Sequence, residues 1–551
     1  MQNASQIAAG LRARPGLGAH GEGRGLRPWQ VAAALGSLHL LLILLTWNPA
    51  FDPGGDNAAY YGLARSLLER GDYVELWDPQ LVPHTLYPPG FPLILAAAMR
   101  LGVQPWAGFK LLVAGFGVLA VAVSYLWARK AGSPRTGFFV GLLLAISPGV
   151  VAQSQRELSD VPFLLFTFAA LFSFAQCERP DQRIPPASCV GWVAAGSAAT
   201  MLACLTRAAG LPLALAAGGW LALRGRRRAL VLFLAIVGPP VAAWLVWQAT
   251  ARGGATYTSY LWVVDPYRPE LGAAGARDLL ARVLKNALAY PLTHLSTLLT
   301  GLARWPLAAV FGAVVTVTSL VVWTRRLRRP GVAELFLPLY LALIFAWPAQ
   351  WATDRLLLPV LPLLLLYSAE ALRDVGARVN HPCLLLASAL TVVVATDAAK
   401  TVKQTLRAGE CRAAYASGDR YACYPAEWGD FGRLAEQVRG TLPQGAVVLS
   451  RKPRLFWVIS GYRSRKYPLT TDPDLFFREA REVGADYVVL DPSQESARYL
   501  QKLLGSRPDD FCTVPGVGGR QAALVRVGTT GQSVPQDAPS GVLPFCPPPP
   551  K

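Results

Sequence analysis

The stretch from Trp29 to Trp47, WQVAAALGSLHLLLILLTW, decides the class of fold, and the polar segment NPAFDPGGD follows it at residues 48–56. The run is long for the apolar part of a signal peptide, and no small-residue cleavage site follows it. We therefore interpret it as an uncleaved membrane helix, since a crossing helix needs roughly 20 predominantly apolar residues. The polar, basic residues 1–28 before it would form a cytoplasmic tail.

Apolar runs recur along the chain, which has 551 residues, of which 53% are hydrophobic and only 16% are charged. Such a composition is unusual for a soluble enzyme. Further membrane spans are predicted at 106–128, 136–152, 161–176, 189–205, 211–223, 229–249, 303–323, 332–348, 356–372 and 382–398. The shorter apolar segment 90–102 is predicted to be a helix on the membrane surface. The fold class is mainly α, a polytopic bundle of about eleven spans over residues 29–399.

The net charge of +19 lies mostly at the ends of these runs, which is the pattern of membrane topology and argues against a nucleic-acid partner. With the N-terminus in the cytoplasm, the inner loops are strongly basic. They contain Arg129, Lys130, Arg135, Arg179, Arg183, Arg224, Arg226, Arg227, Arg228, Arg325, Arg326, Arg328, Arg329, Arg373 and Arg378. The short outer loops contain only Arg156, Arg207 and Arg355. High Ala, Arg, Gly and Pro usage hints at a bacterial source, so a multi-pass inner-membrane protein is expected.

This topology places residues 400–551 outside the cytoplasm. Helical patterns alternate there with short apolar strands, which predicts an extracytoplasmic α/β domain over residues 400–528. Helices are expected at 427–439, 473–483 and 494–504, and strands at 446–449, 486–490 and 522–527. No Gly-rich phosphate loop follows the strands, so no nucleotide is assigned. Residues 529–551 have the composition of a disordered, Pro-rich tail.

Four cysteines of this outer region, Cys411, Cys423, Cys512 and Cys546, lie where disulfides can form. Cys411 and Cys423 are the first guess for a pair, and four unpaired thiols are the alternative. The other cysteines, Cys177, Cys189, Cys204 and Cys383, lie in or beside spans and are interpreted as small packing residues.

The first outer loop, residues 48–105, is the segment most suggestive of chemistry. Asp56 opens a predicted helix whose apolar residues, among them Tyr60, form one face suited to lying on the bilayer. A proline-rich turn with His84 and Tyr87 follows. Asp56 is either a helix N-cap or a functional carboxylate, and the two roles are compatible.

Two more acids, Glu157 and Asp160, are predicted on the same membrane face as Asp56, where the alternative role is an ordinary loop with a helix cap. Arg207 and Arg355 share that face, and their alternative role is snorkelling to lipid headgroups. Carboxylates suit proton abstraction from an alcohol, and guanidinium groups suit a phosphate. The set would serve a transferase that displaces a phosphate from a sugar. A metal is possible but not indicated, since no His/Cys/Asp cluster has ligand spacing.

The chain resembles the GT-C class of membrane glycosyltransferases, in particular the branch with protein O-mannosyltransferases and the lipid A aminoarabinose transferase. The resemblance covers about residues 30–400 and rests on five short segments in order. They are Gly55-Asp56, Tyr87-Pro88-Pro89-Gly90-Phe91-Pro92, Glu157-Leu158-Ser159-Asp160-Val161-Pro162, Thr206-Arg207 and Arg355-Leu356-Leu357-Leu358-Pro359. Two further segments, at residues 461–462 and 484–489, resemble the outer domains of bacterial members.

The resemblance implies an inverting transfer from a polyprenyl-phosphate-linked sugar to an acceptor hydroxyl on a glycan, lipid or protein, with no required cofactor. Asp56 would be the general base, and Glu157 or Asp160 the second acidic residue. Arg207 and Arg355 would bind the donor phosphate. The residues Tyr60, His84 and Tyr87 would line the pocket.

The sequence departs from the family pattern in two ways. Asn57 follows Asp56 where many members have a second acid, and Leu86-Tyr87 replaces the lysine of the aminoarabinose transferases. Both departures argue against aminoarabinose and lipid A as substrates. Two other classes of function compete with the transferase: a transporter or flippase of a phosphate-bearing lipid, and a membrane-anchored scaffold.

Overall fold

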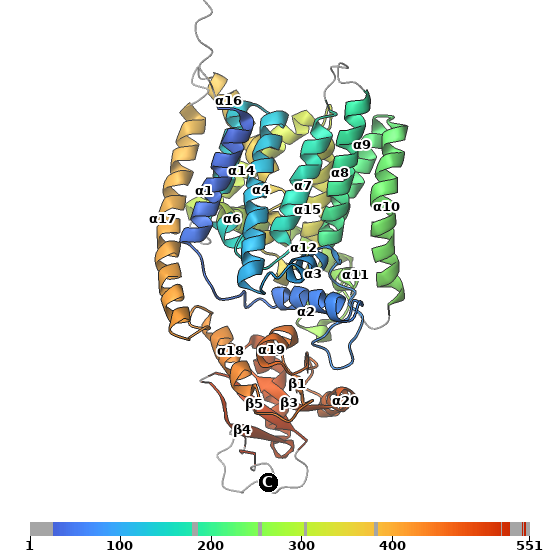
Figure 1. The fold of residues 1–551 in the computed structure, drawn as a ribbon, viewed down its shortest axis with the longest axis vertical. Helices are drawn as coiled ribbons and strands as arrows, with labels where there is room; N and C mark the ends of the chain where they lie inside the picture. The colour runs from blue at the N-terminus through green and yellow to red at the C-terminus, as the bar shows by residue number, and fades with distance from the viewer. Residues whose placement is uncertain are drawn as a thin grey trace, which may run out of the picture.

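The computed structural model describes residues 26–178, 186–251, 256–301, 306–378, 384–519, 521–528, 543 and 545–546. It has two parts, a large helical bundle and a smaller α/β domain near the C-terminus (Figure 1). Most of the predicted basic tail and most of the predicted Pro-rich tail lie outside these residues.

A helix occupies each of the predicted spans. The bundle contains α1 (Pro28–Leu45), α4 (Ala107–Ala131), α5 (Pro134–Ile146), α7 (Asp160–Ala175), α8 (Pro186–Thr206), α9 (Leu211–Leu223), α10 (Arg227–Thr250), α14 (Pro306–Arg326), α15 (Val332–Ala346), α16 (Leu361–Arg378) and α17 (Leu384–Ala416). The predicted run 136–152 is divided, because Pro148 starts the separate helix α6 (Pro148–Gln153). The helices stand side by side, with α17 and α10 at opposite edges (Figure 1).

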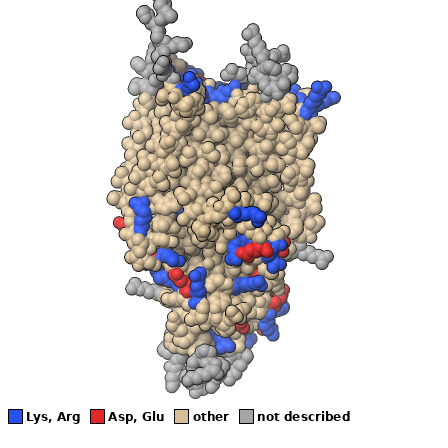
Figure 2. Space-filling model, viewed as in Figure 1, with Lys and Arg blue, Asp and Glu red and all other residues tan. Residues whose placement is uncertain are grey.

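Within the described residues, five helical segments are long and apolar enough to cross a membrane: α1, α4, Cys189–Thr206 of α8, α10 and α14. The face in Figure 2 agrees, since its middle is a wide band almost without charged side chains. Lys and Arg mark the upper edge of this band, and charges of both signs gather below it. The count of eleven spans and their orientation stay predictions.

Two short helices lie at the end of the bundle that faces the α/β domain, α2 (Asp56–Glu69) and α3 (Gly90–Arg100). The second covers the segment predicted as a short surface helix. The apolar face of α2 was expected to lie on the bilayer, and this is wrong. Tyr60 and Leu63 are buried against Phe91 and Phe109, because α3 and α4 cover that face. A periodic apolar stripe in the sequence does not show whether that face of the helix contacts lipid or other parts of the protein.

Close backbone packing brings the start of α3 against the end of α8. A Cβ atom added to Gly90 would lie 2.6 Å from the carbonyl oxygen of Leu205, so only glycine fits there. This contact fixes the turn containing Tyr87 next to Arg207. Three shorter helices follow α10 along the chain: α11 (Tyr257–Leu261), α12 (Ala276–Ala289) and α13 (Leu295–Thr300).

The α/β domain contains a five-stranded sheet of order β2-β1-β3-β5-β4. Its strands are β1 (Val447–Leu449), β2 (Ser464–Arg465), β3 (Ala485–Leu490), β4 (Phe511–Gly518) and β5 (Ala523–Val527). Strand β1 pairs in parallel with β2 and β3, whereas β5 is antiparallel to β3 and β4. The helices are α18 (Ala426–Val438), α19 (Pro453–Ser460), α20 (Pro473–Val483) and α21 (Gln501–Ser506). The predicted strands and helices of the domain are present, but α19, β2 and β4 were not predicted.

The domain packs on the first outer loop of the bundle. The Ser464 amide donates to the Trp77 carbonyl over 2.7 Å, and the Tyr424 hydroxyl donates to the Phe51 carbonyl over 2.6 Å. A Cβ added to Gly62 of α2 would lie 3.3 Å from the Trp457 ring of α19. The two parts therefore meet across a tight contact between α2 and α19.

Disulfides join Cys411 to Cys423, as predicted, and Cys512 to Cys546. Cys177, just after α7, and Cys189 of α8 lie next to each other, with Cα atoms 5.8 Å apart. They flank a loop that the predicted topology places in the cytoplasm, where disulfides are rare, so their interpretation as packing residues stays a prediction. Cys204 is a buried free thiol, and Cys383 lies outside the described residues.

Candidate active site

Asp56 is the first residue of α2, directly after Gly55, which adopts a left-handed conformation with φ of 94°. The carboxylate is not a simple helix cap. One oxygen accepts from the Tyr87 hydroxyl over 2.8 Å, and the other accepts from both terminal nitrogens of Arg355 over 3.2 Å. Residues that lie 299 positions apart thus meet at this carboxylate.

The surroundings of Asp56 hold it ionised. Partial burial alone would raise its pKa, but the guanidinium groups of Arg355 and Arg454 and the hydrogen bond from Tyr87 outweigh this effect and lower the pKa. The position at the start of a helix also favours a negative charge. Asp56 is therefore an ionised carboxylate able to accept a proton from a neighbouring group.

A second carboxylate and arginine pair lies beside the first. Asp160, the first residue of α7, is 2.8 Å from an Arg207 nitrogen. The same nitrogen donates to the Ser159 hydroxyl over 3.1 Å, and that hydroxyl lies 2.8 Å from the Tyr60 hydroxyl. One oxygen of Asp160 is buried and has no hydrogen-bond partner among the described residues.

The two pairs form one cluster. The rings of Tyr60 and Tyr87 are 4.9 Å apart and connect them. Burial alone would lower the Arg355 pKa, but the charges of Asp160 and Asp56 outweigh this effect and raise it. Each guanidinium is engaged by a carboxylate and does not snorkel freely. The predicted residues Asp56, Asp160, Arg207 and Arg355 are thus brought together.

Glu157 has different partners from these four residues and holds the first outer loop in place. Its side chain accepts from the Asp52 amide over 3.2 Å and from the Asn57 side chain over 3.3 Å. The buried Lys110 lies 3.7 Å from Glu157 and donates to the carbonyls of Asn48 and Ala50. The sequence left the choice between Glu157 and Asp160 open, and the geometry favours Asp160 as the second acid near Asp56.

His84 holds the backbone of Tyr87 through a hydrogen bond. Its Nδ1 lies 2.7 Å from the Glu75 carboxylate, and its Nε2 accepts from the Tyr87 amide over 2.9 Å. This arrangement fixes the neutral tautomer with the proton on Nδ1. Burial lowers the pKa of His84 despite the nearby Glu75 carboxylate. The imidazole is fully buried, so it holds the turn and does not face an open space.

The α/β domain contributes residues that the sequence did not reveal as part of the site. Arg454 of α19 donates to the Tyr87 hydroxyl over 2.9 Å, and its guanidinium lies 5.3 Å from the Trp77 ring centroid. Lys452 donates to the carbonyls of Pro53 and Gly54 over 2.9 and 3.1 Å. The available signal was the basic run Arg451-Lys452-Pro453-Arg454 ahead of a helix.

A cavity of about 330 Å³ lies where the first outer loop meets this domain, and Asp56 forms part of its wall. The loop provides Gly54, Gly55, Asp56, Glu75, Trp77 and Asp78, and the domain provides Arg451, Lys452, Pro453, Arg454, Leu455, Ser464, Arg465 and Lys466. Charges of both signs gather in this region of the surface (Figure 2). The cavity gives a ligand access to Asp56 from the side of the α/β domain.

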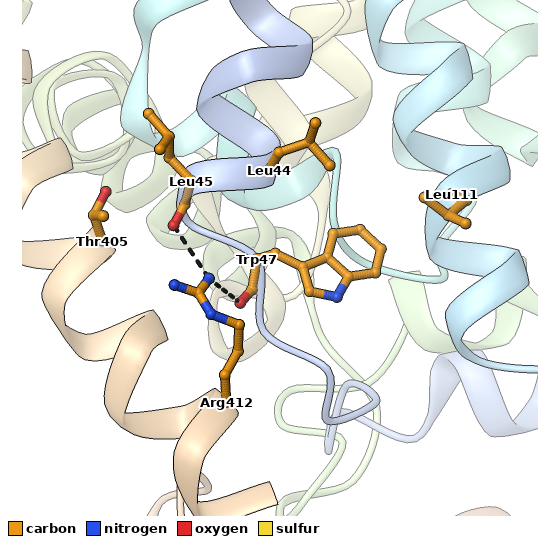
Figure 3. A pocket seen from close by; sticks show the side chains of 6 residues that line it. All are labelled: Leu44, Leu45, Trp47, Leu111, Thr405 and Arg412. Carbon is orange, nitrogen blue, oxygen red and sulfur yellow. Dashed lines mark hydrogen bonds between the residues drawn. The ribbon is translucent and has the colours of Figure 1, made fainter. Parts of the chain in front are cut away.

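A second cavity of about 340 Å³ lies between α1, α4 and α17 (Figure 3). Leu44, Leu45, Trp47 and Leu111 line it with Thr405 and Arg412. The guanidinium of Arg412 donates to the carbonyls of Leu45 and Trp47 over 3.3 and 3.2 Å, so it caps the end of α1. Because its lining is mostly apolar and contains no acid, this cavity is not a candidate active site.

Metal ligands do not cluster in the part of the chain that the structure describes, where no group of three or more His, Cys, Asp or Glu side chains could hold an ion.

Comparisons with known proteins agree with the resemblance in the sequence. A family model for dolichyl-phosphate-mannose-protein mannosyltransferase matches residues 85–263, which is less than half of the chain. The match includes Tyr87, Asp160 and Arg207 but not Asp56 or Arg355. No curated protein matches the chain in sequence.

Solved structures are similar over almost the whole chain. The oligosaccharyltransferase of Archaeoglobus fulgidus, in complex with Zn and sulfate, has a TM-score of 0.55 at 15% identity, covering 90% of this chain and 73% of that one. ArnT from Cupriavidus metallidurans, bound to undecaprenyl phosphate, has a TM-score of 0.53 at 16% identity, covering 91% and 99%. The chain therefore shares its fold with these two proteins.

Proposed function

We propose that this protein is an inverting glycosyltransferase that moves a sugar from a polyprenyl-phosphate donor to the hydroxyl of an acceptor. The observation that carries the proposal is an ionised Asp56, held by Arg355 and Tyr87 at the wall of a cavity beside the Asp160–Arg207 pair. The family match over residues 85–263 and the fold shared with ArnT bound to undecaprenyl phosphate support a lipid-linked donor.

The proposed reaction is a single displacement at the anomeric carbon of the sugar. The acceptor oxygen forms the new bond to this carbon while the bond from the carbon to the phosphate oxygen breaks. The electron pair leaves with polyprenyl phosphate, and Asp56 takes the acceptor proton. Attack on the face opposite the leaving group inverts the anomeric configuration. A positioned general base contributes typically about 10²–10⁴-fold to such a step.

The two arginines would stabilise the departing phosphate. A guanidinium group has five N–H donors in a planar fork, and Asp56 engages Arg355 through only its two terminal nitrogens. Donors of Arg355 and Arg207 that remain free could bind phosphate oxygens. Positive charge at that position stabilises the negative charge that develops on the leaving group. Asp160 would orient Arg207 and the sugar.

The location follows the predicted topology. The site would lie on the extracytoplasmic face of a bacterial inner membrane, with the N-terminus in the cytoplasm. The lipid tail of the donor would remain in the bilayer while its phosphate reached the arginines at the end of the bundle. The acceptor would approach from the side of the α/β domain, through the cavity beside Asp56.

The deciding experiment incubates the full-length protein in lipid nanodiscs with a panel of radiolabelled polyprenyl-phosphate sugars. We expect the wild-type protein to release polyprenyl phosphate from one donor, and Asp56→Asn to release almost none. Asp72→Asn is the matched control, since Asp72 belongs to the same loop but pairs with the exposed Arg70. Donor binding that survives Asp56→Asn, with no release by the wild-type protein, would favour a lipid transporter.

A further inference from the structure

The cavity beside Asp56 contains more positive charge than its carboxylates neutralise. Arg451 pairs with Glu495 at 2.7 Å, and Arg465 pairs with Asp78 at 2.6 Å. Three other cations line the same cavity, Lys452, Arg454 and Lys466. Among the residues that the structure describes, none of these three forms an ion pair with a carboxylate.

The acids of the cavity wall are already engaged elsewhere. Asp56 pairs with Arg355, and Asp78 pairs with Arg465. Glu75 accepts a hydrogen bond from the neutral His84, and its charge and that of Asp56 act on Arg454 without an ion-pair contact. The unpaired cations all belong to the α/β domain, whereas Asp56 belongs to the bundle. An electropositive surface therefore faces the proposed general base across the cavity.

Lys452 is held in a definite position without an anionic partner. Its ammonium donates to the Pro53 and Gly54 carbonyls and lies 3.6 Å from the centroid of the Trp428 ring. Its stem is close to the backbone that leads into α2, since a Cβ added to Gly55 would lie 3.9 Å from its Cδ. The ammonium is therefore fixed at the Gly54 carbonyl, two residues before α2 begins at Asp56.

The charge on Lys452 is costly where it stands. Burial and the neighbouring Arg451 lower its pKa to about 8, although Asp56, Asp52 and Glu427 oppose this effect. A bound anion would relieve the cost, because opposite charges at short range favour the charged form of both partners. A buried lysine without an anionic partner is therefore well suited to bind an anion.

We propose that the cavity between α2 and α19 binds an anionic group of the acceptor, a phosphate or a carboxylate, that lies close to the accepting hydroxyl. The role of the cavity as the acceptor site rests on the proposed function. Lys452 and Lys466 would bind the anion, and Asp56 would face the hydroxyl. The volume of about 330 Å³ lies within the size range of small-molecule sites and suits a single sugar unit.

Calorimetric titration of the full-length protein in nanodiscs tests the inference without any transfer reaction. The nanodiscs contain saturating undecaprenyl phosphate, so that the proposed donor-phosphate site is filled. The ligands are glucose 6-phosphate and glucose, which differ only in the anionic group. We expect glucose 6-phosphate to bind at least tenfold more tightly than glucose.

The variants locate the anion. The double variant Lys452→Gln/Lys466→Gln should bind glucose 6-phosphate at least tenfold more weakly than the wild-type protein. The matched control Lys502→Gln changes an exposed lysine of α21 and should bind as the wild-type protein does. Retained binding of undecaprenyl phosphate by the double variant would verify that it is folded.

Three results would overturn the inference: equal affinity for the two ligands, an unchanged double variant, or an equal loss in Lys502→Gln. Loss of glucose 6-phosphate binding in Arg207→Gln but not in the double variant would also overturn it, since the anion would then belong to the donor site. Because this titration needs no sugar transfer, its result is independent of whether any donor is turned over.

Discussion

The two carboxylate and arginine pairs of the site have the same chemistry but different surroundings. In the Asp56–Arg355 pair the side chains are 31% and 29% exposed, at a distance of 3.2 Å. In the Asp160–Arg207 pair Asp160 is only 4% exposed, Arg207 is 17% exposed, and the distance is 2.8 Å. The looser pair lies at the wall of a cavity, so a ligand can exchange with its partners. The tighter pair is enclosed, and it joins the start of α7 to the end of α8.

This difference predicts that loss of the open pair affects mainly turnover, whereas loss of the enclosed pair also lowers stability. The largest effect on turnover is expected from Asp56→Asn, which keeps the shape of the side chain but removes the base. We expect transfer to fall by about 10²–10⁴-fold, while undecaprenyl phosphate still binds. Release of labelled polyprenyl phosphate measures the loss. Near-normal release would break the comparison, because the open pair would then have no part in the chemistry.

Arg355→Ala tests the other member of the open pair. We expect donor turnover to fall by roughly 10²–10³-fold, which is the usual effect of removing one well-placed donor to a developing negative charge. Asp354→Ala is the control at the neighbouring position and should have a much smaller effect. A larger loss in Asp354→Ala than in Arg355→Ala would reject the role of Arg355 at the phosphate.

Asp160→Asn tests the enclosed pair through stability. Removing one partner of a buried pair leaves an uncompensated charge on Arg207, which typically costs about 3–5 kcal/mol. We expect thermal unfolding in lipid at a clearly lower temperature than for Asp56→Asn. The double variant Asp160→Asn/Arg207→Met should regain part of the loss, because it removes the unpaired charge. Equal stability of Asp56→Asn and Asp160→Asn would erase the distinction between the pairs.

Tyr87→Phe tests how the open pair is positioned, since the Tyr87 hydroxyl donates to Asp56 and accepts from Arg454. One hydrogen bond to a carboxylate contributes about 1.5–3 kcal/mol, so transfer should fall by roughly tenfold or more. The Tyr87 hydrogen bond also helps to lower the pKa of Asp56. Its removal raises that pKa, and the acid limb of the pH–rate profile should move to higher pH. An unchanged acid limb would show that Tyr87 acts only through packing.

The smallest effect concerns pH and the α/β domain. The pKa of Lys452 is lowered to about 8, so the free protein loses this positive charge as the pH rises through that value. A bound anion favours the protonated amine and raises its pKa. The affinity for glucose 6-phosphate should therefore be greatest below pH 8 and fall above it. In Lys452→Gln the loss of affinity above pH 8 should be smaller. A loss of the same size in that variant would show that another group titrates.

Much of this site could be predicted because its parts carry local signals. The long apolar runs predicted the long helices of the bundle. Asp160, Arg207 and Arg355 stood out as charged residues near the ends of such runs, and Asp56 as the start of a helix in the first outer loop. The choice between Glu157 and Asp160 could not be made, because both lie in one short loop. Only the contacts of Lys110 with Glu157 and of Arg207 with Asp160 separate them.

The role of the α/β domain could not be predicted, and the reason is physical. Helix α19 is short, and its contact with α2 joins segments about 400 positions apart in the chain. No periodic pattern or residue spacing in the sequence predicts such a long-range contact. The run Arg451-Lys452-Pro453-Arg454 signals a basic segment, but its meeting with Asp56 depends on the docking of the whole domain.

The docking of α19 on α2 also sets the order in which the protein matures. Ribosomal synthesis delivers Asp56 first and Arg454 nearly four hundred residues later, so every helix of the bundle can insert before the site is complete. Domains generally fold as units during synthesis, with N-terminal ones first. A nascent chain stopped after α17 would contain Asp56, Arg207 and Arg355, yet lack the α/β-domain side of the cavity beside Asp56. The cavity beside Asp56 would therefore be complete only after the α/β domain has been synthesised and folded.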